Sequence, residues 1–343
     1  MTGFFSHNAI TAKIRVLYGK RITKSEYGEL LKKVTVNEIA AFLKETKAYK
    51  EVLENVDSSL LHRGQLESLL RRSFFNEQLS ILKFSQNEDT AFLKNLISKY
   101  EIEQILSFFN FLKSKRTNEF IYSVPDYIVE YSKINLTGIS GCSSFEEFKE
   151  LISGTEYESI FRNYIPENDN DYSSLEKLLY SFYYAKIFKN IDKFSSYKAN
   201  VKTFYLHEIE ILNFIHILRL KKYYKATPSD IEKHIIPFSS KKAISLFKEI
   251  IDAPDDVLAL EILCKSKYSK FFANKDFNVV EQYLLSFTYD ISKQNLVSGK
   301  ASNVIPLAYL NFKDIEIHNI ICIIEGKRYG VPSEEIKGHL IGI

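Results

Sequence analysis

Apolar side chains recur along this chain at the spacing of an amphipathic α-helix. Near the carboxyl end, Ile317, Ile320, Ile321 and Ile324 stand at positions i, i+3, i+4 and i+7, which places them on one helical face. The strict alternation of apolar and polar residues that marks a half-buried strand is hard to find. The pattern therefore predicts an all-α fold.

Helix starts can be recognised by their capping residues. Thr23 and Glu26 are spaced as a capping box, in which each side chain binds the backbone N–H of the other residue. Ser144 and Glu147 repeat that spacing. We therefore expect helices to begin directly after Thr23 and after Ser144.

The C-terminal stripe is preceded by a glutamate, and this combination occurs three times. The segments are Glu-Ile-Glu-Gln at 101–104, Glu-Ile-Leu-Asn at 210–213 and Glu-Ile-His-Asn at 316–319. The leading glutamates, Glu101, Glu210 and Glu316, stand 109 and 106 residues apart. A basic residue follows each glutamate by twelve positions, and these residues are Lys113, Lys222 and Arg328.

Two other short motifs recur in the same order and with a similar period. A Leu-Glu-x-Leu-Leu segment begins at Leu66 and at Leu175, and a looser copy begins at Val280. A tyrosine follows a threonine or serine by two or three residues in the pairs Thr46/Tyr49, Thr155/Tyr157 and Ser266/Tyr268. A period of roughly 107 residues is the size of a domain and exceeds the 20–50 residues of solenoid repeats. The chain is therefore expected to contain three tandem helical units.

The expected units cover residues 1–99, 100–204 and 205–306, and a half-copy covers 307–343. Arranged around a pseudo-threefold axis, three such units would enclose a hollow. The half-copy would then pack near the first unit and close the circle. The first unit lacks a complete Glu-Ile-x-Asn segment, so its equivalence to the other two has the least support.

Composition and charge exclude several classes of protein. The 46 basic and 43 acidic residues give a net charge of +3, which provides no strong field for nucleic acid or anionic lipid. The three cysteines lack CxxC spacing and fit a reducing compartment. The longest wholly apolar run found is 320–324, whereas a membrane span needs about 20 residues, and the N-terminus does not read as a signal peptide. We therefore expect a cytoplasmic protein without a transmembrane segment.

Motifs of catalysis and metal binding are missing. Gly19-Lys20 and Gly326-Lys327 are each followed by arginine, so neither forms a phosphate-binding loop of the Walker type. His207-Glu208 lacks the second histidine of a zinc motif. Glutamates that recur once per unit do not predict two carboxylates in one pocket. We expect no catalytic residue, no cofactor and no metal ion.

The repeated polar residues favour a structural role, and contact with a partner is the alternative. A glutamate with an amide three residues later is suited to bridging one unit to the next. The bridge would be a bond from Glu210 to an arginine, or from Asn213 to backbone.

These segments in this order, together with Asn-Ala-Ile-Thr-Ala-Lys-Ile-Arg at 8–15, resemble the C subunit of prokaryotic A/V-type ATPases. The equivalent protein of eukaryotic pumps is called the d subunit. The resemblance runs from about Asn8 to Leu340. It implies a funnel-shaped, non-catalytic rotor subunit that is peripheral to the membrane. Such a subunit joins the central shaft, made of D-type and F-type subunits, to the membrane proteolipid ring. It transmits torque for ATP-driven ion transport or ATP synthesis, and it binds neither nucleic acid nor a small-molecule substrate.

The resemblance also supplies candidate residues for contact between domains or with partners. These are Lys13, Arg15, Glu210, Asn213, Arg219, Glu316 and Asn319. Lys13 stands where the family carries arginine, and a lysine ammonium lacks the planar fork with which a guanidinium makes a bidentate contact.

Two other classes of function stay open. A helical adaptor for an unrelated partner would not co-purify with a proteolipid ring. An unrecognised enzyme would need a convergent polar pocket.

Overall fold

The computed structural model describes residues 2–84, 88–162, 164, 172–194, 197–269, 280–299, 302 and 304–343. Throughout these ranges every regular element is a helix, so the all-α prediction is confirmed. No helix in the described part of the chain is long and apolar enough to cross a membrane. The sequence also predicts an acidic loop at 166–171 and a helix cap at Asn278, and both lie outside the described residues.

The chain divides into two compact units. The first comprises Met1–Gln86, Ala199–Ile215 and Ala253–Ile343, and the second comprises Asn87–Lys198 and His216–Asp252. Helix α13, Lys198–Tyr224, contributes residues to both.

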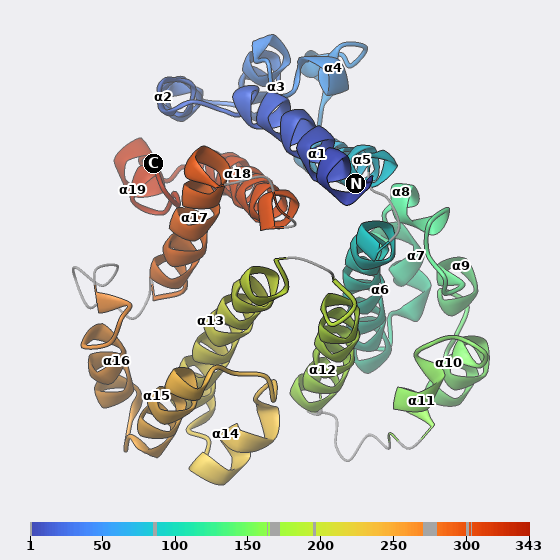
Figure 1. Ribbon diagram of the computed structural model, residues 1–343. Coiled ribbons are helices and arrows are strands. Elements are labelled where there is room, and N and C mark those ends of the chain that lie inside the picture. Colours follow the sequence, from blue (N-terminus) through green and yellow to red (C-terminus); the bar gives the residue numbers. More distant parts are fainter. Residues whose placement is uncertain are drawn as a thin grey trace. The chain divides into compact units, whose positions relative to one another are not determined.

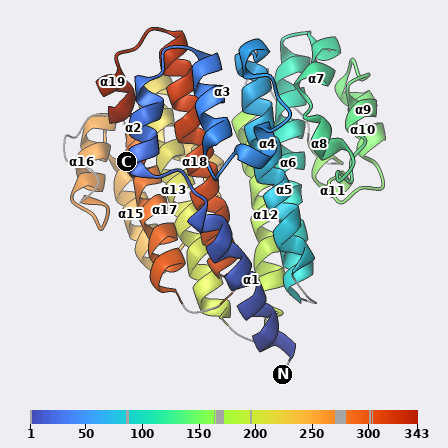
Figure 2. The same cartoon turned by 90° about the horizontal axis from the view of Figure 1, so that it is seen from above.

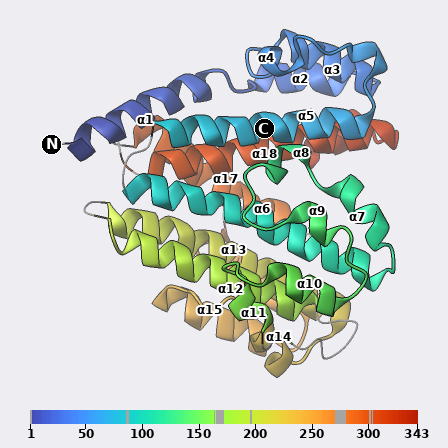
Figure 3. The same cartoon turned by 90° about the vertical axis from the view of Figure 1, so that its right-hand side faces the viewer.

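The first unit is organised around α18. Besides part of α13, its helices are α1 (Thr2–Gly19), α2 (Lys24–Lys32), α3 (Val36–Glu45), α4 (Lys50–Leu53), the 3-10 helix η1 (Ser58–Leu60), α5 (Arg63–Lys83), α16 (Asp256–Cys264), α17 (Val280–Ser298), α18 (Val304–Arg328) and α19 (Ser333–Gly338). Helix α18 packs against α17, α5, α1 and α3. Figure 3 shows α5 running alongside α18, and in Figure 2 α2, α3 and α19 gather near one end of α18.

The sequence of α18 explains its central place. Ile317, Ile320 and Ile324 are buried as the apolar stripe predicts, and only Ile321 of the stripe is partly exposed. Helix α18 is apolar and buried on most of its circumference, and Asp314 and His318 lie on its exposed face. After its last residue the chain turns at Gly330, whose φ of 69° lies in the left-handed region that glycine adopts without strain.

The second unit is organised around α6 and α12. Its helices are α6 (Glu88–Lys113), α7 (Thr117–Ser123), α8 (Asp126–Val129), α9 (Leu136–Ile139), α10 (Phe145–Ile152), α11 (Glu158–Phe161), α12 (Tyr172–Ile191), α14 (Pro228–His234) and α15 (Lys241–Asp252). Helices α6 and α12 lie side by side, and α7 packs against α6 (Figure 1). Between α6 and the short helices, the Phe148 ring stacks on Phe108 at 5.2 Å and meets Phe161 edge-on at 5.0 Å.

Both predicted helix starts are confirmed. The Thr23 side chain accepts a hydrogen bond from Glu26 N, while the Glu26 carboxylate accepts from Thr23 N. Ser144 accepts from Glu147 N at the start of α10.

The expected boundaries of the repeats fall inside long helices. The boundary at 99/100 lies within α6, the one at 204/205 within α13, and the one at 306/307 within α18. The repeated segments mark the middle of these helices, because each helix continues for several turns before its glutamate. The division into three similar units stays a prediction from the sequence pattern.

Candidate functional site

The three repeated glutamates are buried, one on each of the longest helices. Glu101 on α6 is 1% exposed, Glu210 on α13 is 0% exposed and Glu316 on α18 is 2% exposed. A carboxylate shielded from water is unfavourable unless hydrogen bonds or opposite charges replace the water. The partners of these three side chains therefore define what the repeated segment does.

Each glutamate accepts a hydrogen bond from a tyrosine of the second repeated motif. The donor is the hydroxyl of Tyr157 for Glu101, at 2.7 Å, and of Tyr268 for Glu210, at 2.9 Å. For Glu316 the donor is the hydroxyl of Tyr49, at 2.9 Å. The repeated glutamate segment and the repeated tyrosine motif are therefore in contact at three places in the structure. We call each of these contacts a Glu–Tyr pair.

The third pair joins the two ends of the chain. Glu101 and Tyr157 are 56 residues apart and Glu210 and Tyr268 are 58 apart, but Glu316 pairs with a tyrosine 267 residues earlier. The glutamate that the N-terminal region lacks is therefore supplied by α18. The sequence predicts that the C-terminal segment packs near the N-terminal one, and this contact is how the structure brings them together.

Around Glu101, backbone and hydroxyl groups complete the set of donors. Lys133 N donates to one carboxylate oxygen at 2.5 Å, and Ser132 Oγ donates to the same oxygen at 3.3 Å. The Tyr157 hydroxyl binds the other oxygen. The carboxylate therefore ties α6 to the loop before α9 and to the turn before α11.

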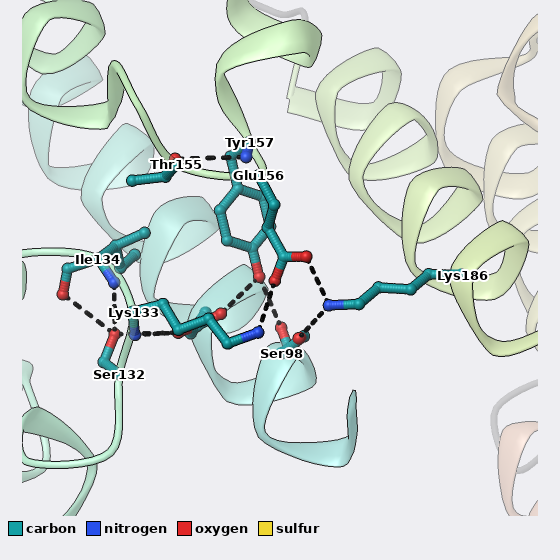
Figure 4. A network of polar contacts seen from close by, with 9 residues as sticks. Ser98, Ser132, Lys133, Ile134, Thr155, Glu156, Tyr157 and Lys186 are labelled. Atoms are coloured by element: carbon teal, nitrogen blue, oxygen red, sulfur yellow. Dashed lines mark hydrogen bonds and ion pairs between the residues drawn. The ribbon is translucent and has the colours of Figure 1, made fainter. Parts of the chain in front are cut away.

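A second layer of charges surrounds this pair. Glu156 accepts from Lys186 Nζ of α12 at 2.5 Å and lies 3.3 Å from Lys133 Nζ (Figure 4). Lys186 also reaches Ser98 Oγ of α6, at 3.3 Å. Burial raises the pKa of Glu156, but the hydrogen bond and charge of Lys186 outweigh burial and hold that pKa below its ordinary value. The network thereby connects α6, α12 and the segment that carries Tyr157.

Around Glu316 the donors include a buried cation. Ile22 N and Lys313 Nζ each donate to the carboxylate at 2.8 Å. The Lys313 side chain is only 4% exposed, lies 4.3 Å from the centre of the Tyr49 ring and is 3.8 Å from Glu77. Burial lowers the pKa of Lys313, but Glu316 and Glu77 raise it further than burial lowers it. Lys313 is therefore held in its charged form.

Glu210 is also paired with a tyrosine, but its cationic neighbour comes from a different sequence position than that of Glu316. Lys267 Nζ lies 2.7 Å from the carboxylate, next in sequence to the paired Tyr268. The Tyr268 ring packs edge-on against Phe287 at 4.7 Å and Phe214 at 5.3 Å. These contacts fix the phenol against α13.

The environment of the pairs keeps the tyrosines protonated. Burial raises the pKa of Tyr49, Tyr157 and Tyr268 above the ordinary 10.0, and the neighbouring carboxylate raises each of them further. A phenol in this setting stays a donor, and the carboxylate beside it remains an acceptor.

We expect the change Tyr157→Phe to lower the free energy of unfolding by about 1–3 kcal/mol, because one oxygen of the buried Glu101 carboxylate loses its donor. Urea denaturation followed by circular dichroism measures this change. Tyr122→Phe, at a residue that is 89% exposed in the same unit, is the matched control and should change stability by less than about 0.5 kcal/mol. Equal stabilities of the Tyr157→Phe variant and the parent would contradict a stabilising pair.

The amide residues of the repeats are also buried. Asn319 donates from Nδ2 to the Ile341 carbonyl at 2.9 Å and accepts from Ile341 N at 2.8 Å. A bond from the repeated amide to backbone is therefore present at Asn319. Asn213 is 0% exposed, and Gln104 is 8% exposed.

The remaining candidate residues lie nearer the surface. Lys13 is half-buried with its Nζ 5.8 Å from the centre of the Phe84 ring, and the exposed Arg15 donates to the Gly299 carbonyl at 3.4 Å. Arg219 is exposed, and its charge partly offsets the burial that raises the pKa of Glu176. The structure thus divides the candidates into buried residues and residues nearer the surface; the buried ones are Glu210, Asn213, Glu316 and Asn319.

Sequence reasoning found the repeated tyrosines but did not pair them with the glutamates, and it missed Lys313. The common period was the available signal, because residues that recur together in every copy are candidates for contact. Among the residues that the structure describes, no cluster of His, Cys, Asp and Glu side chains is arranged to hold a metal ion.

Long helices tied to distant segments by three buried Glu–Tyr pairs define an all-helical protein. The model of the family described as ATP synthase (C/AC39) subunit matches residues 10–339. The chain belongs to this family, and the resemblance indicated by its repeated segments is confirmed.

Several archaeal proteins, each named as the C subunit of an A-type ATP synthase, are similar over nearly their full length. The protein of Thermococcus kodakarensis is 26% identical, over 95% of this chain and 88% of its own. The proteins of Methanococcoides burtonii and Archaeoglobus fulgidus are each 22% identical, over 97% of this chain and 93% and 95% of their own chains.

Proposed function

We propose that this chain is a non-catalytic subunit of the central rotor of an A/V-type ATPase. In this role it connects the shaft, made of D-type and F-type subunits, to the membrane proteolipid ring and transmits torque for ATP-driven ion transport or ATP synthesis. The chain belongs to the ATP synthase (C/AC39) subunit family, and this membership supports its assignment to such a complex. The observation that best supports a mechanical role is the threefold recurrence of the buried Glu–Tyr pair.

A part that transmits torque must resist deformation. Surface ion pairs contribute only about 0–1 kcal/mol each and yield easily. Removing one partner of a buried hydrogen bond costs about 1–3 kcal/mol, because the other partner is left buried without it. Each Glu–Tyr pair holds a long helix to a segment at least 56 residues away in sequence, so the connection does not depend on local helix stability.

The proposal includes an arrangement and a location. Three helical units surround a pseudo-threefold axis and form a funnel that receives the shaft, while its other face meets the polar loops of the ring. The protein lies on the cytoplasmic side and is peripheral to the membrane. Lys13, Arg15 and Arg219 are the proposed partner contacts among the candidate residues, because their side chains are accessible.

Co-purification tests the connection. Shaft subunits and a detergent-solubilised proteolipid ring are mixed with and without this chain, and the shaft is then captured. We expect the ring to be retained only when the chain is present. Retention of the ring without the chain would contradict the proposal. Failure of the chain to bind either the shaft or the ring would also contradict it, and this result would favour a helical adaptor with another partner.

Charge reversal separates partner contact from folding. Arg15→Glu is expected to weaken capture by about tenfold with an unchanged melting temperature. Lys265→Glu, at a side chain that is 76% exposed, is the control and should be captured like the parent. Equal capture of both variants would remove Arg15 from the proposed contacts.

A further inference from the structure

A cavity of about 260 Å³ lies within the first unit, beside the buried Glu316. It is lined by the end of α1, the start of α2, α17 and α18, and we call it the α17–α18 cavity. Drug-sized ligands occupy about 300–1,000 Å³, so any ligand of this cavity is compact.

One side of the cavity is a wall of aromatic rings. Tyr18 meets Phe312 edge-on at 5.0 Å, and Tyr289 meets the same Phe312 ring at 5.3 Å. Tyr27 also lines the cavity. Such a wall offers flat apolar surface against which another ring can pack.

Three cationic side chains line the same cavity, namely Arg21, Lys24 and Lys293. The Arg21 guanidinium lies over the Tyr18 ring at 4.2 Å, and Lys293 Nζ lies 5.7 Å from the centre of the Tyr289 ring. These cations therefore stand directly against the aromatic wall. None of the three forms an ion pair with another residue in the described ranges.

The carboxylate in the cavity does not balance these charges. Glu316 already accepts from Ile22 N and Tyr49 and is matched by the ammonium of Lys313 at 2.8 Å. Glu316 is therefore not available to neutralise the three lining cations. Arginine and lysine in this setting favour a multiply charged anion, and phosphate is the anion that both bind well.

We propose that the α17–α18 cavity binds a small organic phosphate, in which an aromatic body packs on the wall of rings and the phosphate contacts Arg21, Lys24 and Lys293. The family resemblance implies no small-molecule substrate. The residues of this cavity come from segments about 270 residues apart and form no local motif that a sequence could reveal. The proposal does not depend on the rotor role. A ligand here bridges the α1–α2 junction to α17, so it also stabilises the first unit by mass action.

Isothermal titration calorimetry of the full chain with phenyl phosphate and with inorganic phosphate tests this site. We expect phenyl phosphate to bind at least tenfold more tightly, because only it contacts the rings. Arg21→Gln and Lys293→Gln should each weaken phenyl phosphate binding by about tenfold. Lys33→Gln is the matched control, because this lysine lies at the other end of α2, over the Phe42 ring at 5.2 Å, and should bind like the parent.

Lys293 is exposed on α17, so Lys293→Gln keeps the test valid even if Arg21→Gln fails to fold. Three results would each overturn the proposal. They are no binding of phenyl phosphate at millimolar concentration, equal affinities for phenyl phosphate and inorganic phosphate, and an equal loss in Lys33→Gln.

Discussion

The change Glu316→Ala is expected to lower the free energy of unfolding by about 3–5 kcal/mol. Lys313, with a side chain only 4% exposed, would lose the carboxylate at 2.8 Å that compensates its burial. The same substitution removes the acceptor of the Tyr49 hydroxyl and of Ile22 N. Urea denaturation followed by circular dichroism gives the difference in free energy.

Two further variants separate the unpaired charge from other effects. Glu334→Ala removes a carboxylate whose side chain is 88% exposed and should change stability by less than about 0.5 kcal/mol. The double variant Glu316→Leu with Lys313→Met removes both charges and should be more stable than Glu316→Ala, because apolar residues of similar size often replace a buried pair without loss. A double variant as unstable as the single one would show that unpaired charge is not the cause.

The sequence carried enough information for the fold class and for the repeated segment. Ile317, Ile320 and Ile324 are buried because helical periodicity is a local property that a single stretch reveals. The helix start at Thr23 was equally predictable, since capping depends on residues three apart. Glu316 is buried, and its partners satisfy the carboxylate, so a structural role stays a prediction that its surroundings favour.

What the sequence did not reveal is which residues meet across long separations. The basic residue twelve positions after each glutamate recurs with it, but Arg328 is exposed at the end of α18, near the Tyr329 ring. Cations are favoured there because the carbonyl end of a helix is negative. The cation that pairs with Glu316 is Lys313, one helical turn earlier, and the other partner, Tyr49, is 267 residues away. Only the packed structure brings these groups together.

The second large effect is expected at high pH. An unfolded tyrosine ionises near pH 10, whereas burial and then the neighbouring carboxylate raise the pKa of Tyr49, Tyr157 and Tyr268 in the folded protein. The stabilisation from a raised pKa is complete below the unfolded value and is lost as the pH rises above it. The raised pKa of Lys313 acts in the same direction.

Each such tyrosine removes up to about 1.4 kcal/mol of stability per pH unit above its unfolded pKa. An unfolded tyrosine is only half ionised at pH 10, so the three Glu–Tyr pairs together should lower the free energy of unfolding by about 3 kcal/mol between about pH 10 and pH 11. Urea denaturation at a series of pH values measures this slope. Phenolate absorbance measured alongside it reports when the tyrosines ionise.

Exposed tyrosines provide the internal control for this experiment. Solvent-exposed tyrosines in general ionise near pH 10, and they should do so here while helicity is still intact. The paired tyrosines should ionise only together with the loss of helical circular dichroism, because their phenolate forms would lie against buried carboxylates. If all 22 tyrosines ionise smoothly near pH 10 while the helices remain, the Glu–Tyr pairs do not hold their protons, and the stabilising role assigned to them is wrong.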